Sequence, residues 1–408
     1  VIEPDPPTSA NLFADGVSVI AGEPTATATY QAAGAERARL VFANLGDAAN
    51  TNVTLAVREC APDVPIVALA DDDNSIDVLE LAGATKVLPL KRELGEHLAS
   101  RVTVGTPKAH RIGRFEDLVI AEFPIENTSL PGRTIRDTRL RELTGLSIVG
   151  VWERGKFEPA RPDTVLSPHS VPVLVGTAEQ MTELDALFVI YRPNENPVLV
   201  IGGGKVGGAA ARALRERDIA VTVLDKDPAT ERAFADSADR VVVGDAADLK
   251  VVTNAGLPDA PSVVLTTNDD ATNIFLAVYC RRLNAEVHIL SRITDDWNVE
   301  AIHRAGADFA LSHPSLAARA VLSEALGSDL VVLGEGADLF VEAVPASLVG
   351  KTLATSGIGA ETGLAVIAVR SEGASVTNPS GATELAAGAE LVMIGTVAQH
   401  KAFVSTFA

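Results

Sequence analysis

The chain has 408 residues, and its 34 Lys and Arg against 54 Asp and Glu give a formal net charge of −20. This charge argues against nucleic acid as a partner, because phosphate contacts need clustered cations. Only two cysteines occur, which excludes a disulfide-rich secreted scaffold, and no apolar run is long enough for a transmembrane helix. The first residues include neither a starting methionine nor a signal-peptide pattern, so we expect a fragment or a processed form of a longer protein.

The chain contains the same two-part unit twice. Residues 1–6 (VIEPDP) match residues 223–228 (VLDKDP), and residues 129–135 (SLPGRTI) match residues 347–353 (SLVGKTL). Repeats at a nearly constant spacing predict an order A1–C1–A2–C2, in which an N-terminal lobe (A) is followed by a C-terminal lobe (C). The predicted boundaries are 1–100 for A1, 101–178 for a linker and C1, 179–326 for a connecting helix and A2, and 327–408 for C2.

The A lobes alternate short apolar strands with helices, which predicts an α/β fold with a doubly wound, Rossmann-like parallel sheet. In A2 we predict strands at 198–201, 220–224, 240–243, 262–265 and 287–290, and helices at 208–217, 274–283 and 299–305. A1 begins at the equivalent of the second of these strands, so its first strand, glycine turn and first helix are absent from this sequence. A parallel sheet without that strand has an exposed edge, and we expect the missing piece upstream in the natural protein or on a partner.

The C lobes have a different pattern, with apolar strands separated by turns that contain Gly and Pro, which predicts small α+β modules. The predicted strands are 118–123, 147–151 and 171–175 in C1, and 339–344, 365–370 and 390–394 in C2. We interpret residues 101–114 as a polar linker. Residues 177–196 join C1 to A2, with a helix that we expect to end near residues 191–193.

Residues 202–207 (GGGKVG) follow a predicted strand and precede a predicted helix, which is the context required of a G-x-G-x-x-G nucleotide-binding loop. Gly202 permits the tight turn, Gly204 lets backbone amides approach a pyrophosphate, and Gly207 lets the helix pack closely on the strand. The helix N-terminus adds free N–H groups and the positive end of its dipole. The alternative is a glycine turn that serves only packing. The loop residues assigned to the cofactor are Gly202, Gly203, Gly204, Lys205, Val206 and Gly207.

Asp225 ends the second predicted strand of A2, where a carboxylate accepts hydrogen bonds from ribose hydroxyls and repels a 2′-phosphate. This favours NAD or another adenine nucleotide of the ADP, AMP or ATP type over NADP, although the neighbouring Lys226 weakens the preference. Further candidates at the same sheet edge are Gly244, Asp245 and Ala246 after the third strand, Thr267, Asn268, Asp269 and Asn273 after the fourth, and Arg292 after the fifth.

These further candidates have simpler interpretations. Asp269 and Asp270, with Thr267, are equally well explained as an N-cap cluster for the next helix, and Arg292 as a solvated side chain. A1 is depleted at the same positions: Glu3 stands for Asp225, Gly46 for Asp269 and Leu69 for Arg292. We therefore predict a complete ligand site only in A2.

Other functional classes have weaker support. Asp71, Asp72 and Asp73 could hold Ca²⁺ through carboxylate oxygens, but a solvated acidic loop is the commoner explanation. The seven histidines show no zinc-ligand spacing, and no nucleophile–base arrangement can be argued. Trp152 and Trp297 are interpreted as packing residues.

The tandem A–C order, the 202–207 turn, the 244–246 step (GDA) and the 267–273 segment together resemble RCK domains, the regulators of K⁺ conductance, also called Trk-type N and C domains. Residues 363–370 (GLAVIAVR), followed by Asn378 and Pro379, resemble the C-terminal lobe of the family. The resemblance implies that such units pair into a ring on the cytoplasmic face of the cell membrane, where bound nucleotides or cations change the shape of the ring and so the pore. It also implies a homotetramer of eight RCK units, soluble as this fragment, below a potassium channel pore encoded upstream of Val1.

Three functions follow from these patterns. The first is a ligand-sensing gating ring of a K⁺ channel, favoured by the similarity of residues 149–155 (VGVWERG) and 88–91 (LPLK) to tandem-RCK bacterial channels. The second is a soluble NAD-binding regulatory subunit of a Trk-type potassium transporter. The third is an NAD-dependent oxidoreductase, since the same fold serves both classes, but C2 offers only His400 and no catalytic constellation. We therefore expect a sensor and not an enzyme.

Overall fold

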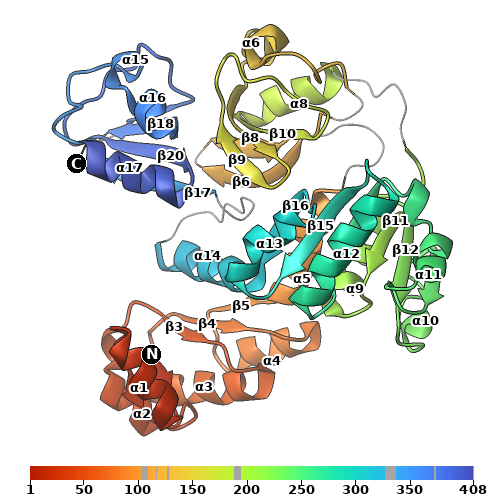
Figure 1. Ribbon diagram of the computed structural model, residues 1–408. Coiled ribbons are helices and arrows are strands. Elements are labelled where there is room, and N and C mark those ends of the chain that lie inside the picture. The colour runs from red at the N-terminus through yellow and green to blue at the C-terminus, as the bar shows by residue number, and fades with distance from the viewer. Residues whose placement is uncertain are drawn as a thin grey trace. The chain divides into compact units, whose positions relative to one another are not determined.

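The apolar runs between residues 198 and 312 form one parallel sheet of six strands (Figure 1). In this computed structural model, which describes residues 1–102, 109–115, 117–125, 128–187, 194–326, 337–371 and 374–407, the strand order is β13–β12–β11–β14–β15–β16. Because β11 pairs with β12 on one side and β14 on the other, their carboxyl ends flank the crevice where doubly wound sheets bind ligands. The strands are β11 Val198–Ile201, β12 Val221–Asp225, β13 Arg240–Val243, β14 Ser262–Leu265, β15 His288–Ile293 and β16 Phe309–Ser312.

The helices of A2 include two that begin earlier than predicted. Helix α9 begins at Lys205 and α12 at Asp270, because their first turns consist of Gly and polar capping residues that an apolar periodicity does not include. Asp269 caps α12 by accepting a hydrogen bond from the Thr272 amide at 2.9 Å. The helices are α9 Lys205–Arg215, α10 Thr230–Ala233, α11 Leu249–Asn254, α12 Asp270–Leu283, α13 Val299–Arg304 and α14 His313–Leu326.

A1 lacks the counterpart of β11, as predicted. Its strands form two separate parallel sheets, β1–β2 and β3–β4–β5, and the described residues contain no strand that joins β1 to β3. In A2 the equivalent pair, β12 and β14, is joined by β11, so the break in A1 falls where the missing strand would lie. The A1 elements are β1 Ile2–Glu3, α1 Pro6–Ala14, β2 Ile20–Ala21, α2 Thr27–Ala33, β3 Val41–Ala43, α3 Asp47–Cys60, β4 Ile66–Leu69, α4 Ile76–Leu81 and β5 Lys86–Leu88.

The duplication extends to hydrogen bonds between side chains and the backbone. The Asp47 carboxylate accepts from the amides of Asp71 and Asp72, at 2.6 and 3.1 Å. In A2 the Asp270 carboxylate accepts from the equivalent amides of Thr294 and Asp295 at 2.9 and 3.0 Å.

A pair of arginines repeats in the same way. The guanidinium of Arg58 donates to the carbonyls of Val64 and Gly83, and that of Arg281 donates to the carbonyls of Val287 and Gly306. Each arginine thereby joins the end of one helix to two neighbouring loops. In both copies the arginine holds loops that precede the amino ends of two neighbouring strands, and the sequence patterns did not identify these bonds.

Each C lobe is a mainly antiparallel sheet with short helices. The C1 order is β6–β7–β10–β8–β9, and the C2 order is β17–β20–β18–β19. C1 comprises β6 His110–Phe115, β7 Leu118–Glu122, α6 Ile135–Thr138, α7 Leu140–Thr144, β8 Ser147–Glu153, β9 Lys156–Pro159 and β10 Ser170–Gly176, followed by α8 Ala178–Leu187. C2 comprises β17 Asp338–Ala343, α15 Leu353–Ser356, α16 Ile358–Thr362, β18 Ala365–Ser371, β19 Ala374–Thr377, β20 Glu390–Gly395 and α17 Val397–Phe407.

The two C lobes share one apolar core. Ile120, Trp152 and Val173 of C1 belong to the same buried cluster as Ile367 and Val392 of C2. At its border the Asn378 side chain accepts from Ser147 Oγ at 2.6 Å and donates to the Gly145 carbonyl at 3.0 Å. C1 and C2 therefore pack against each other through apolar contacts, and the Asn378 side chain adds hydrogen bonds between them.

The prediction of a polar linker over 101–114 is wrong at its C-terminal end. Residues 110–115 form β6, which pairs with β7 and buries Ile112 between the exposed Arg111 and the half-buried Gly113. With one buried apolar side chain, this strand has too little hydrophobic pattern to be recognised from the sequence. Residues 103–108, and the helix end expected near 191–193, lie outside the described residues.

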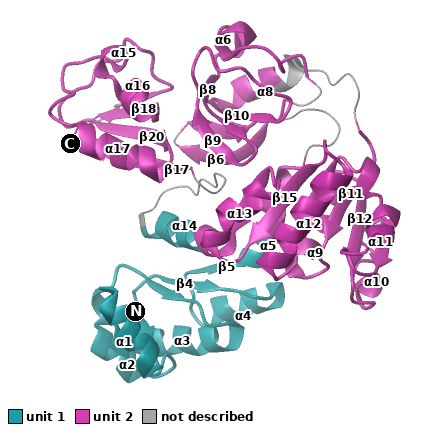
Figure 2. Cartoon of the chain, viewed as in Figure 1, with its two compact units in different colours: residues 1–93, 317–327 teal, residues 94–316, 328–408 magenta. Residues whose placement is uncertain are grey.

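The chain divides into two compact units, residues 1–93 with 317–327 and residues 94–316 with 328–408 (Figure 2). Helix α5, Leu90–Ser100, follows the last strand of A1, yet its residues from Leu94 onward belong to the second unit. Helix α14 follows the last strand of A2, yet its residues from Ala317 onward belong to the first. Among the described residues, none of the helices combines the length and the apolar character that crossing a bilayer requires.

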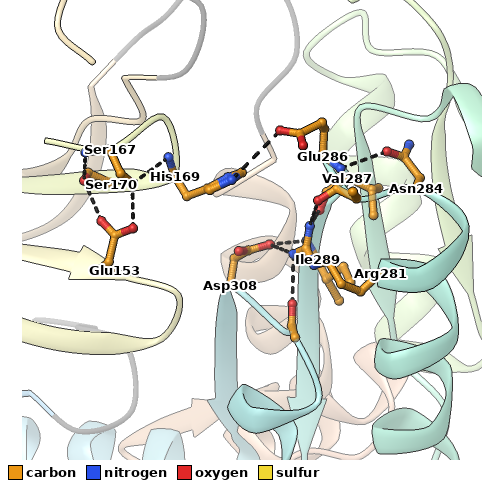
Figure 3. A network of polar contacts seen from close by, with 12 residues as sticks. Glu153, Ser167, His169, Ser170, Arg281, Asn284, Glu286, Val287, Ile289 and Asp308 are labelled. Atoms are coloured by element: carbon orange, nitrogen blue, oxygen red, sulfur yellow. Dashed lines mark hydrogen bonds and ion pairs between the residues drawn. The ribbon is translucent and has the colours of Figure 1, made fainter. Parts of the chain in front are cut away.

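C1 and A2 meet in a polar network. In C1, Ser167 and Ser170 donate to the two carboxylate oxygens of Glu153, and His169 Nε2 lies 3.9 Å from Glu286 Oε2 of A2 (Figure 3). Deeper in the junction, Arg101 Nε donates to Glu122 Oε2 at 2.6 Å, and both side chains are at most 4% exposed. The junction therefore combines a surface contact with a fully buried ion pair.

Breaking that ion pair should destabilise the second unit. We expect Glu122→Gln to lower the free energy of unfolding by about 3 kcal/mol, because it leaves the Arg101 charge buried without its partner. The matched control is Glu300→Gln, which removes an exposed helix pair with Arg304 (3.4 Å) and should cost less than about 0.5 kcal/mol. Equal urea midpoints for the two variants would contradict this account.

Acid should also destabilise this unit. Burial, with the charges of Arg217 and Arg101 and His288 nearby, lowers the pKa of His110 to about 3, and burial with Arg101 lowers the pKa of His97 to about 4. The unfolded chain takes up these protons near the ordinary histidine pKa of about 6.5, so stability present above that pH is lost as the pH falls towards the folded-state values. We expect urea unfolding at about pH 5 to show a loss of about 1–2 kcal/mol per histidine relative to pH 7.5, and His110→Gln to reduce the slope.

Candidate nucleotide-binding site

The glycine loop places backbone against backbone. Gly202 follows β11 with a φ of +109°, which L side chains rarely adopt. A Cβ on Gly207 would lie 1.9 Å from the Gly202 carbonyl oxygen, so α9 packs directly on the turn. A Cβ on Gly204 would meet nothing within 4 Å. The fold therefore requires glycine at 202 and 207, whereas at 204 it leaves open space at the N-terminus of α9.

Thr266 fixes the turn from the adjacent strand end. It is 3% exposed, and its hydroxyl donates to the Gly202 carbonyl at 2.8 Å. Because a loop whose carbonyl is held in this way keeps its amides oriented, Thr266 acts as a positioning residue. Sequence reasoning missed it, although a threonine directly after an apolar strand at the switch point is a usable signal.

Asp225 is in contact with the loop. Its Oδ2 accepts from the Gly203 amide, and its Oδ1 accepts from the Asp227 amide at 2.8 Å. Each carboxylate oxygen has two lone-pair positions, so both keep one acceptor position for another donor. Lys226 is exposed beside it. Thr230, which the sequence patterns did not identify, packs its methyl group 2.7 Å from where a Gly203 Cβ would lie.

The end of β13 contributes a turn. Asp245 is exposed and accepts from the Ala247 amide at 2.9 Å, while Gly244 and Ala246 are half-buried. A Cβ on Gly244 would lie 2.7 Å from Val251, so packing alone accounts for this glycine. A ligand role for these three residues stays a prediction.

The ends of β14 and β15 are joined by buried polar side chains. Asn273 is fully buried, and its amide donates to the carbonyls of Thr267 and Arg292 at 3.1 and 3.3 Å. Arg292 is 8% exposed and donates to Asn268 Oδ1 at 2.7 Å, so the interpretation as a solvated side chain is wrong. Its Nε is buried and has no hydrogen-bond partner among the described residues.

The acidic candidates after β14 have structural roles. Asp269 is the N-cap of α12, and hydrogen bonds from the Thr272 hydroxyl and amide lower the pKa of its carboxyl. Asp270 forms the clamp to Thr294 and Asp295 described above. The N-cap alternative therefore accounts for Asp269, and its contact with a ligand stays a prediction.

A1 has the structural hydrogen bonds of the candidate site but not its glycine loop. Glu3 Oε1 accepts from the Asp5 amide at 2.9 Å, as Asp225 does from Asp227. Asn50 is fully buried and donates to the Leu69 carbonyl at 2.8 Å, as Asn273 does to that of Arg292. The structural bonds are thus duplicated, while the arginine and the glycine turn occur only in A2.

The Ca²⁺ hypothesis for residues 71–73 gains no support. Asp71 pairs with Lys91 at 2.6 Å and Asp73 with Arg92 at 3.3 Å. Over the described ranges, no three His, Cys, Asp or Glu side chains are arranged to hold a metal ion. These aspartates act as partners for cations of the chain itself.

Comparison with known proteins agrees with the tandem arrangement. The model of the TrkA-N domain matches residues 1–89 and 198–313, and that of the TrkA-C domain matches residues 120–189 and 339–408. The crystal structure of the GsuK RCK domain is 33% identical with a TM-score of 0.66, and the alignment covers 100% of this chain and 89% of that one. The GsuK channel bound to NAD is 34% identical with a TM-score of 0.64, covering 100% of this chain and 74% of that one.

Curated relatives are more distant. The Trk system potassium uptake protein TrkA of Azorhizobium caulinodans is 26% identical over 63% of this chain, and potassium channel protein 1 of Methanocaldococcus jannaschii is 23% identical over 50%. The matches span 59% and 64% of the length of those two proteins. The chain belongs to the family of tandem TrkA-N and TrkA-C domains, also called RCK domains.

Proposed function

We propose that this chain is the ligand-sensing gating part of a potassium channel and that A2 binds NAD or a related adenine nucleotide. The observation that supports this most directly is the open space over Gly204, at the N-terminus of α9 and beside the Asp225 carboxylate. Family membership supports the regulatory role, and the relative solved as a channel bound to NAD supports the ligand.

The residues present fit such a nucleotide. The amides at the start of α9 would hold the diphosphate, because they point along the helix axis with the positive end of its dipole. Asp225 would accept from ribose hydroxyls through its remaining lone pairs, and it would repel a 2′-phosphate. No bond of the nucleotide needs to break, since a gating ligand acts by its different affinity for two states of the ring.

Two alternatives have less support. An oxidoreductase needs a proton donor at the nicotinamide, and the candidate His400 is instead stacked on Phe340 and hydrogen-bonded to Glu342 at 2.7 Å. A soluble subunit of a Trk-type transporter would use the same binding chemistry. Sequence upstream of Val1 that encodes pore helices and a selectivity filter distinguishes the channel from that subunit.

Asp225→Ala tests the ligand site. Loss of a charged acceptor should weaken NAD binding by about 10- to 100-fold in calorimetry, the equivalent of about 1.5–3 kcal/mol. Asp227→Asn is the control, because it removes a neighbouring charge while its side-chain oxygen can still accept from the Ala229 amide. Equal affinities for the parent chain and Asp225→Ala would exclude the ribose role.

Consumption of NADH with carbonyl substrates by the purified chain would favour the oxidoreductase.

We further propose that the chain assembles as a tetramer. On α12, Phe275 and Val278 are 52% and 53% exposed, and Phe275 stacks on Tyr279 to form an apolar helix face. We expect sedimentation to report the mass of four 42.5 kDa chains and Val278→Asp to reduce it. The control Val165→Asp, at a residue 62% exposed in C1, should leave the mass unchanged. A monomer for the parent chain would contradict the tetramer.

A further inference from the structure

Helix α5 packs closely against α9, and a Cβ on Gly95 would lie 2.7 Å from the Ala209 methyl group of α9. Gly95 lies inside α5, where glycine costs about 1 kcal/mol relative to alanine. A Cβ on Gly95 would lie 2.4 Å from the Val206 carbonyl oxygen and 2.8 Å from the Ala210 amide nitrogen. Val206 belongs to the glycine loop, so α5 contacts the first turn of the helix that would bind the nucleotide phosphates (Figure 1).

A second contact joins the C-terminal ends of α5 and α9. Arg217, just after α9, donates from Nη1 to the Ala99 carbonyl in the last turn of α5 at 2.6 Å. Leu94, Leu98 and Ala99 are fully buried. Because α5 is close-packed and contacts α9 at its middle and in its last turn, the part of α5 from Leu94 onward has little room to move independently of α9.

The residue that follows α5 connects it to C1. Arg101 is 3% exposed, its ion pair with Glu122 reaches β7, and its guanidinium lies 3.9 Å from the ring centroid of Phe309 in β16. The side chains of Arg101 and Glu122 line a cavity of about 20 Å³ together with Trp152 of β8. Glu122 Oε1 and Trp152 Nε1 are buried there with no hydrogen-bond partner among the described residues.

We propose that α5 transmits occupancy of the glycine loop to the first C-terminal lobe, with Gly95 as the positioning residue that couples it to α9. The proposal rests on the nucleotide site proposed above and adds the route by which that site acts. A nucleotide that shifts the first turn of α9 shifts the backbone of α5 against it. The end of α5 carries Arg101, so C1 follows through Glu122, and the surroundings of Trp152 change.

Trp152 gives the readout. The chain has two tryptophans, and Trp297 is 79% exposed, so Trp297→Phe leaves Trp152 as the single emitter at the junction. In this background we expect NAD titration to change the Trp152 emission with the same saturation curve that calorimetry gives for binding. Calorimetric binding with unchanged Trp152 emission would overturn the coupling and leave the nucleotide site intact. Absence of any binding heat would remove the proposed function and the coupling with it.

Two variants test the route. Gly95→Ala should weaken NAD binding by about fivefold or more and abolish the Trp152 response at saturation, because its Cβ forces α5 away from α9. Gly359→Ala, also inside a helix but with room for a Cβ (3.7 Å to the nearest atom), should change neither. Arg217→Met, which leaves the loop untouched, should keep NAD affinity within about twofold and reduce the Trp152 response. A full response in both Gly95→Ala and Arg217→Met would exclude α5 as the route.

Discussion

Direct backbone contact at the start of α9 is the constraint on which the second unit depends. Gly207 sits on the Gly202 carbonyl on one side, and Gly95 of α5 sits on the Val206 carbonyl on the other. Each glycine in a helix costs about 1 kcal/mol of intrinsic stability, but it allows the neighbouring backbone to approach the helix N-terminus directly. A helix end fixed in this way keeps its amides in place, and this preorganisation would lower the cost of binding the nucleotide that we propose there.

The duplication separates structural residues from chemical ones. The carboxylate clamps at Asp47 and Asp270, and the buried amides of Asn50 and Asn273, make the same bonds in both A lobes. The glycine loop and the buried Arg292 occur only in A2. Bonds that occur in both copies are those that the fold requires, and the residues that occur only in A2 are those to which we assign the proposed ligand site.

Regular elements could be predicted closely, and contacts between elements could not. The strands at Arg240–Val243 and Ser262–Leu265 coincide with their predicted ranges, because continuous apolar runs bounded by turns are unambiguous. The juxtaposition of Asp225 with the glycine loop also followed from strand order. Thr266, Arg281 and Gly95 contact residues of other elements. The place of Thr266 directly after a strand is a usable signal, but the patterns around Arg281 and Gly95 carry no sign of their partners. Strand β6 was missed because it presents one buried apolar side chain to its neighbours.

The apolar core that the two C lobes share has a consequence for how the halves of the chain depend on each other. Ile120 and Val173 are shielded from water partly by Ile367 and Val392, which come more than a lobe later in the sequence. A polypeptide ended after the first half would leave that apolar face bare. A substitution on either side of this core therefore changes the packing of both halves. The two copies can diverge in what they bind, but the residues of C1 and C2 that form this core must change together.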